Sequence, residues 1–316
     1  MKKKIFIDGE EGTTGLQINA KLSSHPEVEL LNIDLEKRKD PKERQKMMSL
    51  SDLTFLCLPD EAAVDAVKIS RDLPLSDCPI IIDASSAHRI SKDWVYGLPE
   101  LSNIQKQKIS NSRKVSVPGC YATGANVLIN PLIKNSILSN ETLFTIYAVS
   151  GFSGGGKKLI SHFNANDPEP FFYYGLNLNH KHLPEIKFYN SLKHNPIFVP
   201  SVANFFQGMI VTVPLHLKSL NKGFKIEDIK EIYKHHYNGC YFINFDQSSE
   251  TISENGFFRP DKIINTNKLN ICLFTNDEKD QIILTSCFDN LGKGASSAAI
   301  QCMNLVFGFP ENLNLK

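Results

Sequence analysis

The stretch IFIDGEEGTTG, residues 5–15, decides the fold class of this chain. Three apolar residues that favour a strand run into a glycine turn, which opens a helix-compatible stretch. Glycines at three-residue intervals permit a tight turn, let the backbone approach a pyrophosphate and bring the helix close to the sheet. The spacing GxxGxxG departs from the commoner GxGxxG, but its place in the first strand, turn and helix favours nucleotide binding over a plain structural turn. We therefore predict cofactor contacts from Gly9, Gly12, Thr13, Thr14 and Gly15.

The pattern that follows this stretch predicts two kinds of sheet. Up to about residue 117, the β-rich runs IFID, VELLNI, LTFLCL, IIID and KVSV alternate with polar stretches of helical length, such as residues 59–69. That alternation predicts a parallel sheet built from βαβ units. The second half reads as strands joined by turns with one helix at 226–236, which favours a mostly antiparallel sheet with helices on one face. Residues 294–307 are again helical in composition and could pack back onto the first domain.

Charged residues after the second strand bear on the choice of cofactor. Asp34 would favour the ribose of NAD, whereas Lys37, Arg38 and Lys39 would accept the 2′-phosphate of NADP. The bases outnumber the acid, so the sequence favours NADP(H), with Arg38 as a contact. Further cofactor contacts are predicted at the carboxyl ends of the next strands, where open α/β sheets bind their ligands: Pro59 and Ser85.

Composition excludes several classes of partner. Lys and Arg number 35 against 34 Asp and Glu in 316 residues, so no long-range field suits nucleic acid or a membrane surface. The length suits two domains. The apolar run near the N-terminus is only three residues long, which with the other features predicts a cytoplasmic protein. The seven cysteines form no CxxC pair, which argues against zinc ligands and for thiols in a reducing compartment.

The best candidate for a nucleophile is Cys120 in VPGCYATG, residues 117–124. It follows a strand, lies in a Pro-Gly turn and opens a stretch of helical composition. A thiol at a helix N-terminus feels the positive end of the dipole and nearby amide hydrogens, which favour the thiolate. The same amides can receive the oxyanion of a tetrahedral intermediate. For the other cysteines the simpler reading is a buried small hydrophobic residue.

A second reactive stretch is HKHLPEI, residues 180–186. Two histidines, a lysine and a carboxylate provide a base that can be oriented and cations for an anionic substrate. An HxH pair could be half of a metal site, but no other ligand cluster completes one, so we expect no metal. The histidines at 25, 194, 216, 235 and 236 are expected to be surface or structural residues.

Two loops complete the set of candidates. SGFSGGGKK, residues 150–158, exposes backbone amides and two lysines, which suits a phosphate or a cofactor, although a flexible surface turn would look similar. From it we predict Ser150 and Lys157 as substrate contacts and Gly154 as a cofactor contact. In DASSAHR, residues 83–89, Arg89 can hold a carboxylate or phosphate through a bidentate fork.

Together these motifs resemble the N-acetyl-gamma-glutamyl-phosphate reductase family, in the shorter form that begins with FIDGExGTTG. The resemblance runs nearly end to end through CLPDEAA, IIDASSAHR, PGCYATG, AVSGFSGGGKK, EPFFYYGLNLNHKHLPEI, SVANFFQGMIVTVPLHL and DNLGKGASSAAIQ. It implies NADPH as cofactor, a dimer or tetramer, and a role in arginine biosynthesis. It also implies a Rossmann domain, here 1–117 and 290–316, with an inserted α+β domain, 118–289, related to those of glyceraldehyde-3-phosphate and aspartate-semialdehyde dehydrogenases.

Carried over by position, the resemblance makes Cys120 the nucleophile and His182 the acid/base. It makes Asn290 a cofactor contact near the nicotinamide. The other residues of the second stretch become substrate-binding or orienting residues: His180, Lys181 and Glu185. One position departs, because Val117 stands where the family commonly has Asn, and any contact that the family makes through that amide is in doubt here.

The implied reaction is reduction of an acyl phosphate to an aldehyde through a Cys120 thioester. Two rival functions keep part of this chemistry. One is a related acyl-phosphate reductase acting on aspartyl phosphate or on carrier-bound aminoadipyl phosphate. The other is a catalytically silent protein that senses NADP(H); the presence of Cys120, His182 and Arg89 in one chain argues against it.

Overall fold

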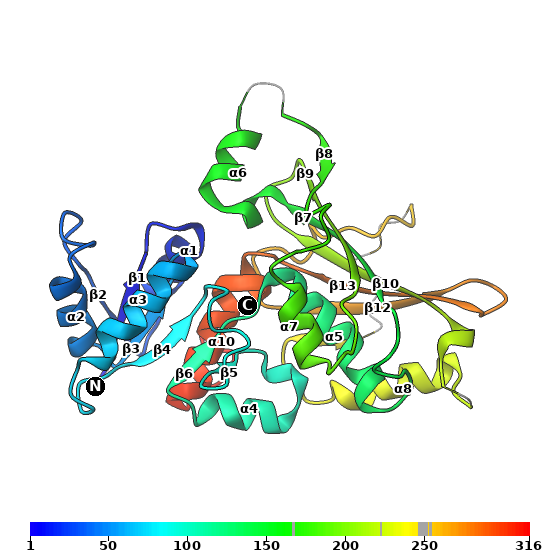
Figure 1. Ribbon diagram of the computed structural model, residues 1–316, viewed down its shortest axis with the longest axis horizontal. Helices are drawn as coiled ribbons and strands as arrows, with labels where there is room; N and C mark the ends of the chain where they lie inside the picture. The colour runs from blue at the N-terminus through cyan, green and yellow to red at the C-terminus, as the bar shows by residue number, and fades with distance from the viewer. Residues whose placement is uncertain (166–167, 222, 246–251, 253–254) are drawn as a thin grey trace. The chain divides into compact units, whose positions relative to one another are not determined.

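The computed structural model describes residues 1–316 except 166–167, 222, 246–251 and 253–254 (Figure 1). The chain folds into two compact units. Unit 1 contains Met1–Pro99, Ile104–Pro118 and Ala295–Leu315, and unit 2 contains Glu100–Asn103, Gly119–Gly294 and Lys316.

Unit 1 is built on a parallel sheet in the order β2-β1-β3-β4-β6-β5 (Figure 1). Every neighbouring pair in this sheet is parallel, which confirms the predicted Rossmann-type α/β class. The two-residue strand β5 was not predicted, because so short a run carries no periodicity. The strands are β1 Lys3–Asp8, β2 Val28–Leu31, β3 Leu53–Leu56, β4 Ile80–Asp83, β5 Val95–Tyr96 and β6 Lys114–Ser116.

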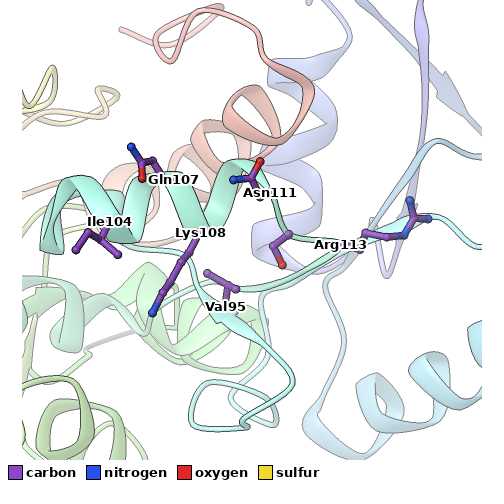
Figure 2. Close-up of a pocket in the computed structure, with 7 residues that line it drawn as sticks. Val95, Ile104, Gln107, Lys108, Asn111 and Arg113 are labelled. Atoms are coloured by element: carbon purple, nitrogen blue, oxygen red, sulfur yellow. The ribbon is translucent and has the colours of Figure 1, made fainter.

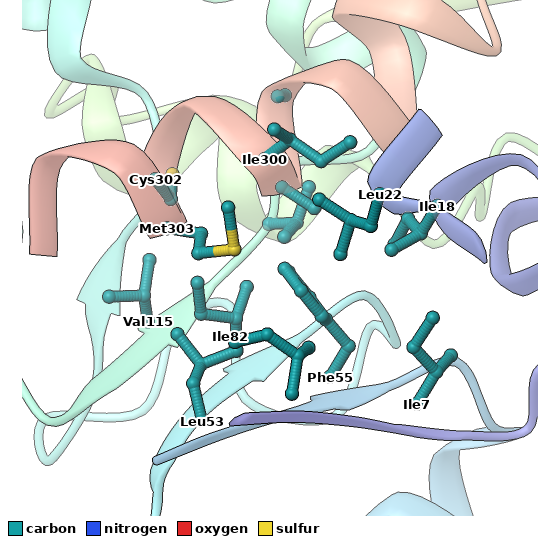
Figure 3. Close-up of a cluster of buried hydrophobic side chains, with 14 of the residues drawn as sticks. Ile7, Ile18, Leu22, Leu53, Phe55, Ile82, Val115, Ile300, Cys302 and Met303 are labelled. Atoms are coloured by element: carbon teal, nitrogen blue, oxygen red, sulfur yellow. The ribbon is translucent and has the colours of Figure 1, made fainter. Parts of the chain in front are cut away.

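Helices from both ends of the chain pack on this sheet. They are α1 Thr13–Leu22, α2 Pro41–Leu50, α3 Asp60–Arg71, α4 Asn103–Ser110 and α10 Ser297–Phe307, the last preceded by a π-helical turn at Gly292–Ser296. Helix α2 begins where Asp40 accepts the amide hydrogen of Lys42 at 2.8 Å, a standard N-cap. The residues of α10 from Ser297 to Leu305 are all buried. Figure 3 shows Ile300 and Met303 of α10 in one core with Leu53 and Phe55 of β3.

Unit 2 holds a mixed sheet in the order β11-β12-β13-β10-β7-β9-β8. Pairs β11–β12 and β7–β9 are parallel and the other neighbouring pairs are antiparallel, so the prediction of a mostly antiparallel sheet is confirmed. The strands are β7 Thr145–Gly151, β8 Phe171–Tyr173, β9 Ile197–Ala203, β10 Met209–His216, β11 Ile243–Phe245, β12 Leu269–Thr275 and β13 Gln281–Phe288. Strand β8, three residues long, was not predicted.

Helix α5, Cys120–Lys134, is the central helix of unit 2. It packs against β10 and β13 and against the helices α7, Leu183–Tyr189, and α8, Ile226–His236. Its residues from Tyr121 to Leu132 are buried. Gly124 permits the close approach to the sheet, because a Cβ there would lie 2.6 Å from Val211. Among the described residues, no helix is long and apolar enough to cross a membrane.

The prediction of one helix in the second half was incomplete. Helix α8 has the predicted bounds, but unit 2 also contains α6, Gly156–Phe163, and α7. Both are only two turns long, and the glycines before α6 and the two histidines before α7 suggested loops. Short 3₁₀ turns at Pro99–Leu101, Phe152–Gly155 and Leu217–Ser219 complete the described elements.

Candidate active site

The predicted nucleophile Cys120 is the first residue of α5. The residue before it, Gly119, is extended (φ −69°, ψ 144°) and has no side chain that could cap the helix. The amide groups of the first turn are therefore available to an anionic group bound at the thiol. Cys120 is half-buried, whereas Cys287 is buried and burial raises the pKa of its thiol. This contrast in exposure fits an accessible thiol at position 120 and an inert one at 287.

Helix α7 is held against the start of α5 by Glu185. Its carboxylate accepts the amide hydrogen of Gly119 at 3.1 Å, and the side chain is 1% exposed. The two helices lie side by side (Figure 1). His182 is the N-cap residue of α7, three positions before Glu185, and is buried. Glu185 thus links α7 to the turn that carries the predicted nucleophile.

The two predicted histidines flank the ring of Tyr121, the residue after the nucleophile. The ring centroids of His180 and His182 each lie 5.8 Å from that of Tyr121 and 4.7 Å from each other. The Nδ1 atom of His180 accepts the amide hydrogen of His182 at 3.1 Å. The structure therefore brings Cys120, both histidines and Glu185 together within unit 2.

Two tyrosines belong to this cluster and were not predicted as site residues. The hydroxyl of Tyr174 lies 3.3 Å from Nε2 of His180, and the hydroxyl of Tyr121 donates to the carbonyl of Ser201 at 3.0 Å. Burial raises the pKa of both hydroxyls, and negative charge on Cys120 adds to the rise. Both phenols are therefore protonated donors at neutral pH. In the sequence Tyr174 stands beside an otherwise similar Tyr173, so no pattern distinguishes it as a site residue.

The turn at residues 289–294 packs closely against the predicted nucleophile, Cys120. A Cβ on Gly294 would lie 2.8 Å from the Cβ of Cys120, so only glycine allows this approach. The side chain of Asn290, a predicted cofactor contact, is buried and engaged within unit 2. Its Oδ1 accepts from the amide of Gly208 at 2.8 Å and its Nδ2 donates to Ser153 at 3.0 Å. Asn290 therefore fixes the shape of the loop that follows β7.

The other candidates of unit 2 differ in exposure. Ser150 is buried and donates to the carbonyl of Gly151 at 2.9 Å, while Gly154 packs beside Ser150 and Asn290. Lys157, at the start of α6, and Lys181 are exposed. Exposed lysines beside this cluster could meet an anionic ligand, but no contact of this structure assigns them that role.

The glycine turn of unit 1 has the shape that a pyrophosphate requires. Gly9 has a φ of +90°, and a Cβ there would lie 2.5 Å from the carbonyl oxygen of Cys57. A Cβ on Gly15 would lie 2.4 Å from the carbonyl oxygen of Gly9, so the helix meets the turn at close range. Helix α1 begins after Gly12 with Thr13 and Thr14. These residues fit a dinucleotide at the N-terminus of a helix.

Some of the remaining residues of unit 1 that were predicted to contact a ligand form hydrogen bonds or ion pairs within the protein. Arg38 is exposed and pairs with Glu11 of the glycine turn, which places it near the predicted phosphate site. Pro59 is exposed and precedes α3. Ser85 is buried and donates to Asp83 at 2.7 Å. Arg89 is buried, and its guanidinium donates to the carbonyl of Val117 at 3.0 Å.

The structure also contains a pocket outside the predicted site residues. An open pocket at α4 of unit 1 is lined by Val95, Ile104, Gln107, Lys108, Asn111, Ser112 and Arg113 (Figure 2). The residues that line it are not among those predicted to act in catalysis or binding. Within the residues that the structure describes, no group of three or more His, Cys, Asp or Glu side chains is placed to hold a metal ion.

Comparison with known proteins defines the class first. Residues 4–110 match the family model of the semialdehyde dehydrogenase NAD binding domain, and residues 120–290 match that of the semialdehyde dehydrogenase dimerisation domain. The fold resembles aspartate semialdehyde dehydrogenase II of Vibrio cholerae with a TM-score of 0.71 at 12% identity, covering 98% of this chain and 99% of that one. The enzyme of Francisella tularensis gives 0.69 at 13% identity, covering 97% and 100%. The chain is therefore of the semialdehyde dehydrogenase class, with an NAD(P)-binding domain.

Curated relatives narrow the class to one family. An N-acetyl-gamma-glutamyl-phosphate reductase of Trichormus variabilis is 41% identical over 324 residues, covering 99% of each chain. One of Burkholderia cenocepacia is 40% identical over 308 residues, covering 96% of this chain and 97% of the relative. The chain belongs to the N-acetyl-gamma-glutamyl-phosphate reductase family.

Proposed function

We propose that the protein reduces N-acetyl-L-glutamyl 5-phosphate to N-acetyl-L-glutamate 5-semialdehyde and phosphate with NADPH, in arginine biosynthesis. The observation that carries this proposal is the arrangement of Cys120 at the N-terminus of α5 with His182 at the N-terminus of α7. Glu185 joins the two helix ends through its bond to Gly119 at 3.1 Å. Glu185 thus joins the helix end that carries the nucleophile and its amide donors to the helix end that carries a proton carrier, which supports acyl transfer.

In the proposed mechanism His182 takes the proton from Sγ of Cys120, and the thiolate attacks the acyl carbon. Phosphate leaves and a thioester remains on Cys120. The amide groups at the start of α5 stabilise the negative charge that develops on the acyl oxygen. NADPH, when bound, supplies the hydride that takes the acyl group to the aldehyde level. His182 returns the proton to Sγ as the aldehyde departs.

The proposal assigns most of the cofactor binding to residues 1–117 with 290–316 and catalysis to residues 118–289. The compact units have other bounds, because residues 100–103 and 290–294 belong to unit 2. Arg89, Lys157, Lys181 and Ser150 are proposed to bind the anionic groups of the substrate. Pro59, Ser85, Gly154 and Asn290 are proposed to shape the cofactor site. A cytoplasmic location is part of the proposal, because a reactive thiol has to stay reduced.

The test is a reverse assay with purified protein, NADP, phosphate and N-acetylglutamate semialdehyde, followed by the absorbance of reduced nicotinamide. We expect reduced nicotinamide to form in proportion to enzyme only when phosphate is present. A substrate panel with aspartate semialdehyde and carrier-bound aminoadipate semialdehyde separates the related reductases. Binding of NADP without turnover of any of these aldehydes would leave the sensor function instead.

We expect Arg38 to favour NADPH over NADH. Its pairing with Glu11 supports a place beside the ribose end of the cofactor. Arg38→Ala should lower kcat/KM for NADPH about tenfold, since a charge-assisted hydrogen bond contributes that much, and leave NADH almost unaffected. Lys46→Ala, which removes an exposed charge on α2, is the matched control and should change neither value. Equal losses with both cofactors in the Arg38 variant would contradict the assignment.

An exposed apolar face of the sheet in unit 2 supports the proposal that the protein forms a homodimer or homotetramer. Tyr147, Ile197 and Ile283 are 48%, 55% and 45% exposed and lie on β7, β9 and β13. They alternate along their strands with the buried Ile146, Phe198 and Ile282, so they lie on the face that α5 does not cover. An exposed apolar sheet face is typical of a surface that pairs with another chain.

Ile283→Arg is therefore expected to lower the molar mass measured by light scattering after size exclusion, because it places a charge in an apolar interface. Leu75→Arg makes a similar change at an exposed leucine of unit 1 and should leave the mass unaltered. An unchanged mass for Ile283→Arg would place the interface on another surface.

A further inference from the structure

Three hydrogen bonds lie beside the candidate nucleophile in unit 2, and the first two form one line. The Nδ1 atom of His180 accepts the amide hydrogen of His182 at 3.1 Å, and its Nε2 atom lies 3.3 Å from the hydroxyl of Tyr174. The hydroxyl of Tyr121 lies 3.0 Å from the carbonyl oxygen of Ser201. The ring centroids of Tyr121 and Tyr174 are 6.5 Å apart.

The direction of the first two bonds is fixed by the backbone of His182. An amide group can only donate, so Nδ1 of His180 must carry a lone pair. A neutral imidazole with a bare Nδ1 has its proton on Nε2. Nε2 therefore donates, and the oxygen of Tyr174 accepts.

The third bond belongs to Tyr121. A carbonyl oxygen can only accept, so the hydroxyl hydrogen of Tyr121 points to the carbonyl of Ser201. The two bonds of the line run in one direction, from the amide of His182 to the oxygen of Tyr174.

We propose that Tyr174 is a positioning residue that holds His180 as the neutral tautomer with its proton on Nε2, and that His180 thereby fixes the backbone of His182. This inference rests on the proposed function only in its kinetic consequence. A proton on Nδ1 of His180 would face the amide hydrogen of His182 and break the line. His180 therefore transfers no proton in the reaction, and that task falls to His182 alone.

Burial makes the line costly to break. His182 is 4% exposed and His180 is 9% exposed, so an amide or ring nitrogen that lost its partner would not regain it from solvent. The ring of Tyr174 packs on the apolar cluster of Phe152, Phe163 and Val202, which holds its hydroxyl in place. Burial raises the pKa of the Tyr121 and Tyr174 hydroxyls, so both stay protonated and remain able to donate a hydrogen bond.

The first test is spectroscopic and needs no substrate. Full-length protein labelled with ¹⁵N-histidine is examined by long-range ¹H–¹⁵N correlation at neutral pH. The signal of His180 is assigned by its loss in His180→Asn. We expect the pattern of the tautomer protonated at Nε2. A pattern of the Nδ1-protonated tautomer or of imidazolium would overturn the proposal.

The second test is kinetic and uses a matched pair of variants. Tyr174→Phe removes one hydroxyl from the line and keeps the ring, and Tyr173→Phe makes the same change at its neighbour, which is 53% exposed. We expect Tyr174→Phe to lower kcat about tenfold, the effect of one lost hydrogen bond on a transition state, with substrate KM little changed. Tyr173→Phe should keep the kcat of the parent protein. Equal kcat values for the two variants would overturn the proposal.

If the parent protein reduces no acyl phosphate, the proposed function fails while the spectroscopic result still decides the tautomer.

Discussion

Cys120→Ser is expected to abolish formation of the aldehyde, with a loss of at least about 10³ in turnover. A serine hydroxyl at neutral pH is almost wholly protonated, so the amide groups of α5 have no ready anion to stabilise. The oxygen ester that serine could form is also a poorer hydride acceptor than a thioester. Turnover is measured in the reverse assay with phosphate and N-acetylglutamate semialdehyde.

Binding of NADPH should survive in the Cys120 variant, because the glycine turn of unit 1 is untouched. It can be followed by the fluorescence of Trp94, the single tryptophan, which is buried in unit 1. Cys78→Ser is the matched control, since Cys78 is half-buried as Cys120 is but lies far from α5 in the sequence. Full activity of Cys120→Ser, or equal losses in both variants, would contradict a covalent mechanism.

The parallel sheet could be predicted because its signals are local. Strands β1, β2, β3, β4 and β6 are runs of β-branched and apolar residues, and Gly9 and Gly15 stand where contacts at 2.5 Å and 2.4 Å admit no Cβ. Short elements could not be predicted from local signals of this kind. Strands β5 and β8 have too few residues to show a period, and each is formed by pairing with a neighbour distant in sequence or across a turn.

The site could be predicted in its residue types but not in its internal bonding. Cys120, His182 and Glu185 were found from their motifs, whereas the bond from Gly119 to Glu185 joins positions 66 apart and needs the fold. Tyr174 differs from Tyr173 only through tertiary structure, which turns one ring to His180 and the other to solvent.

The sequence also could not show which polar groups the fold itself uses. Arg89 donates to the carbonyl of Val117, and Asn290 bonds Gly208 and Ser153. Ser85 donates to Asp83. Ser85 was predicted to contact a ligand from its place after a strand, Arg89 from its bidentate guanidinium and Asn290 from the family resemblance, yet each has partners within its own unit. Their contacts with substrate or cofactor stay predictions.

His182→Asn is expected to lower turnover by roughly 10²–10⁴, the usual contribution of a placed acid or base. Asparagine can still donate a hydrogen bond at this N-cap position, and an N-cap asparagine is well tolerated, so α7 should form. It cannot take the proton from Sγ of Cys120 or return it. The loss should therefore fall on kcat, with substrate KM changed little, as measured from initial rates over a range of semialdehyde concentrations.

The variant His180→Asn distinguishes loss of a proton carrier from loss of orientation, because it changes the histidine next to His182 in the same buried cluster. Since His180 is held neutral between the amide of His182 and the hydroxyl of Tyr174, its loss removes orientation and not a proton carrier. We expect turnover to fall about tenfold, which is the effect of a lost hydrogen bond and well short of the loss at His182. A larger loss of turnover at His180 than at His182 would exchange the two roles. In that case the acid/base would be the histidine whose ring bonds to Tyr174, and the line of hydrogen bonds would be a path for protons.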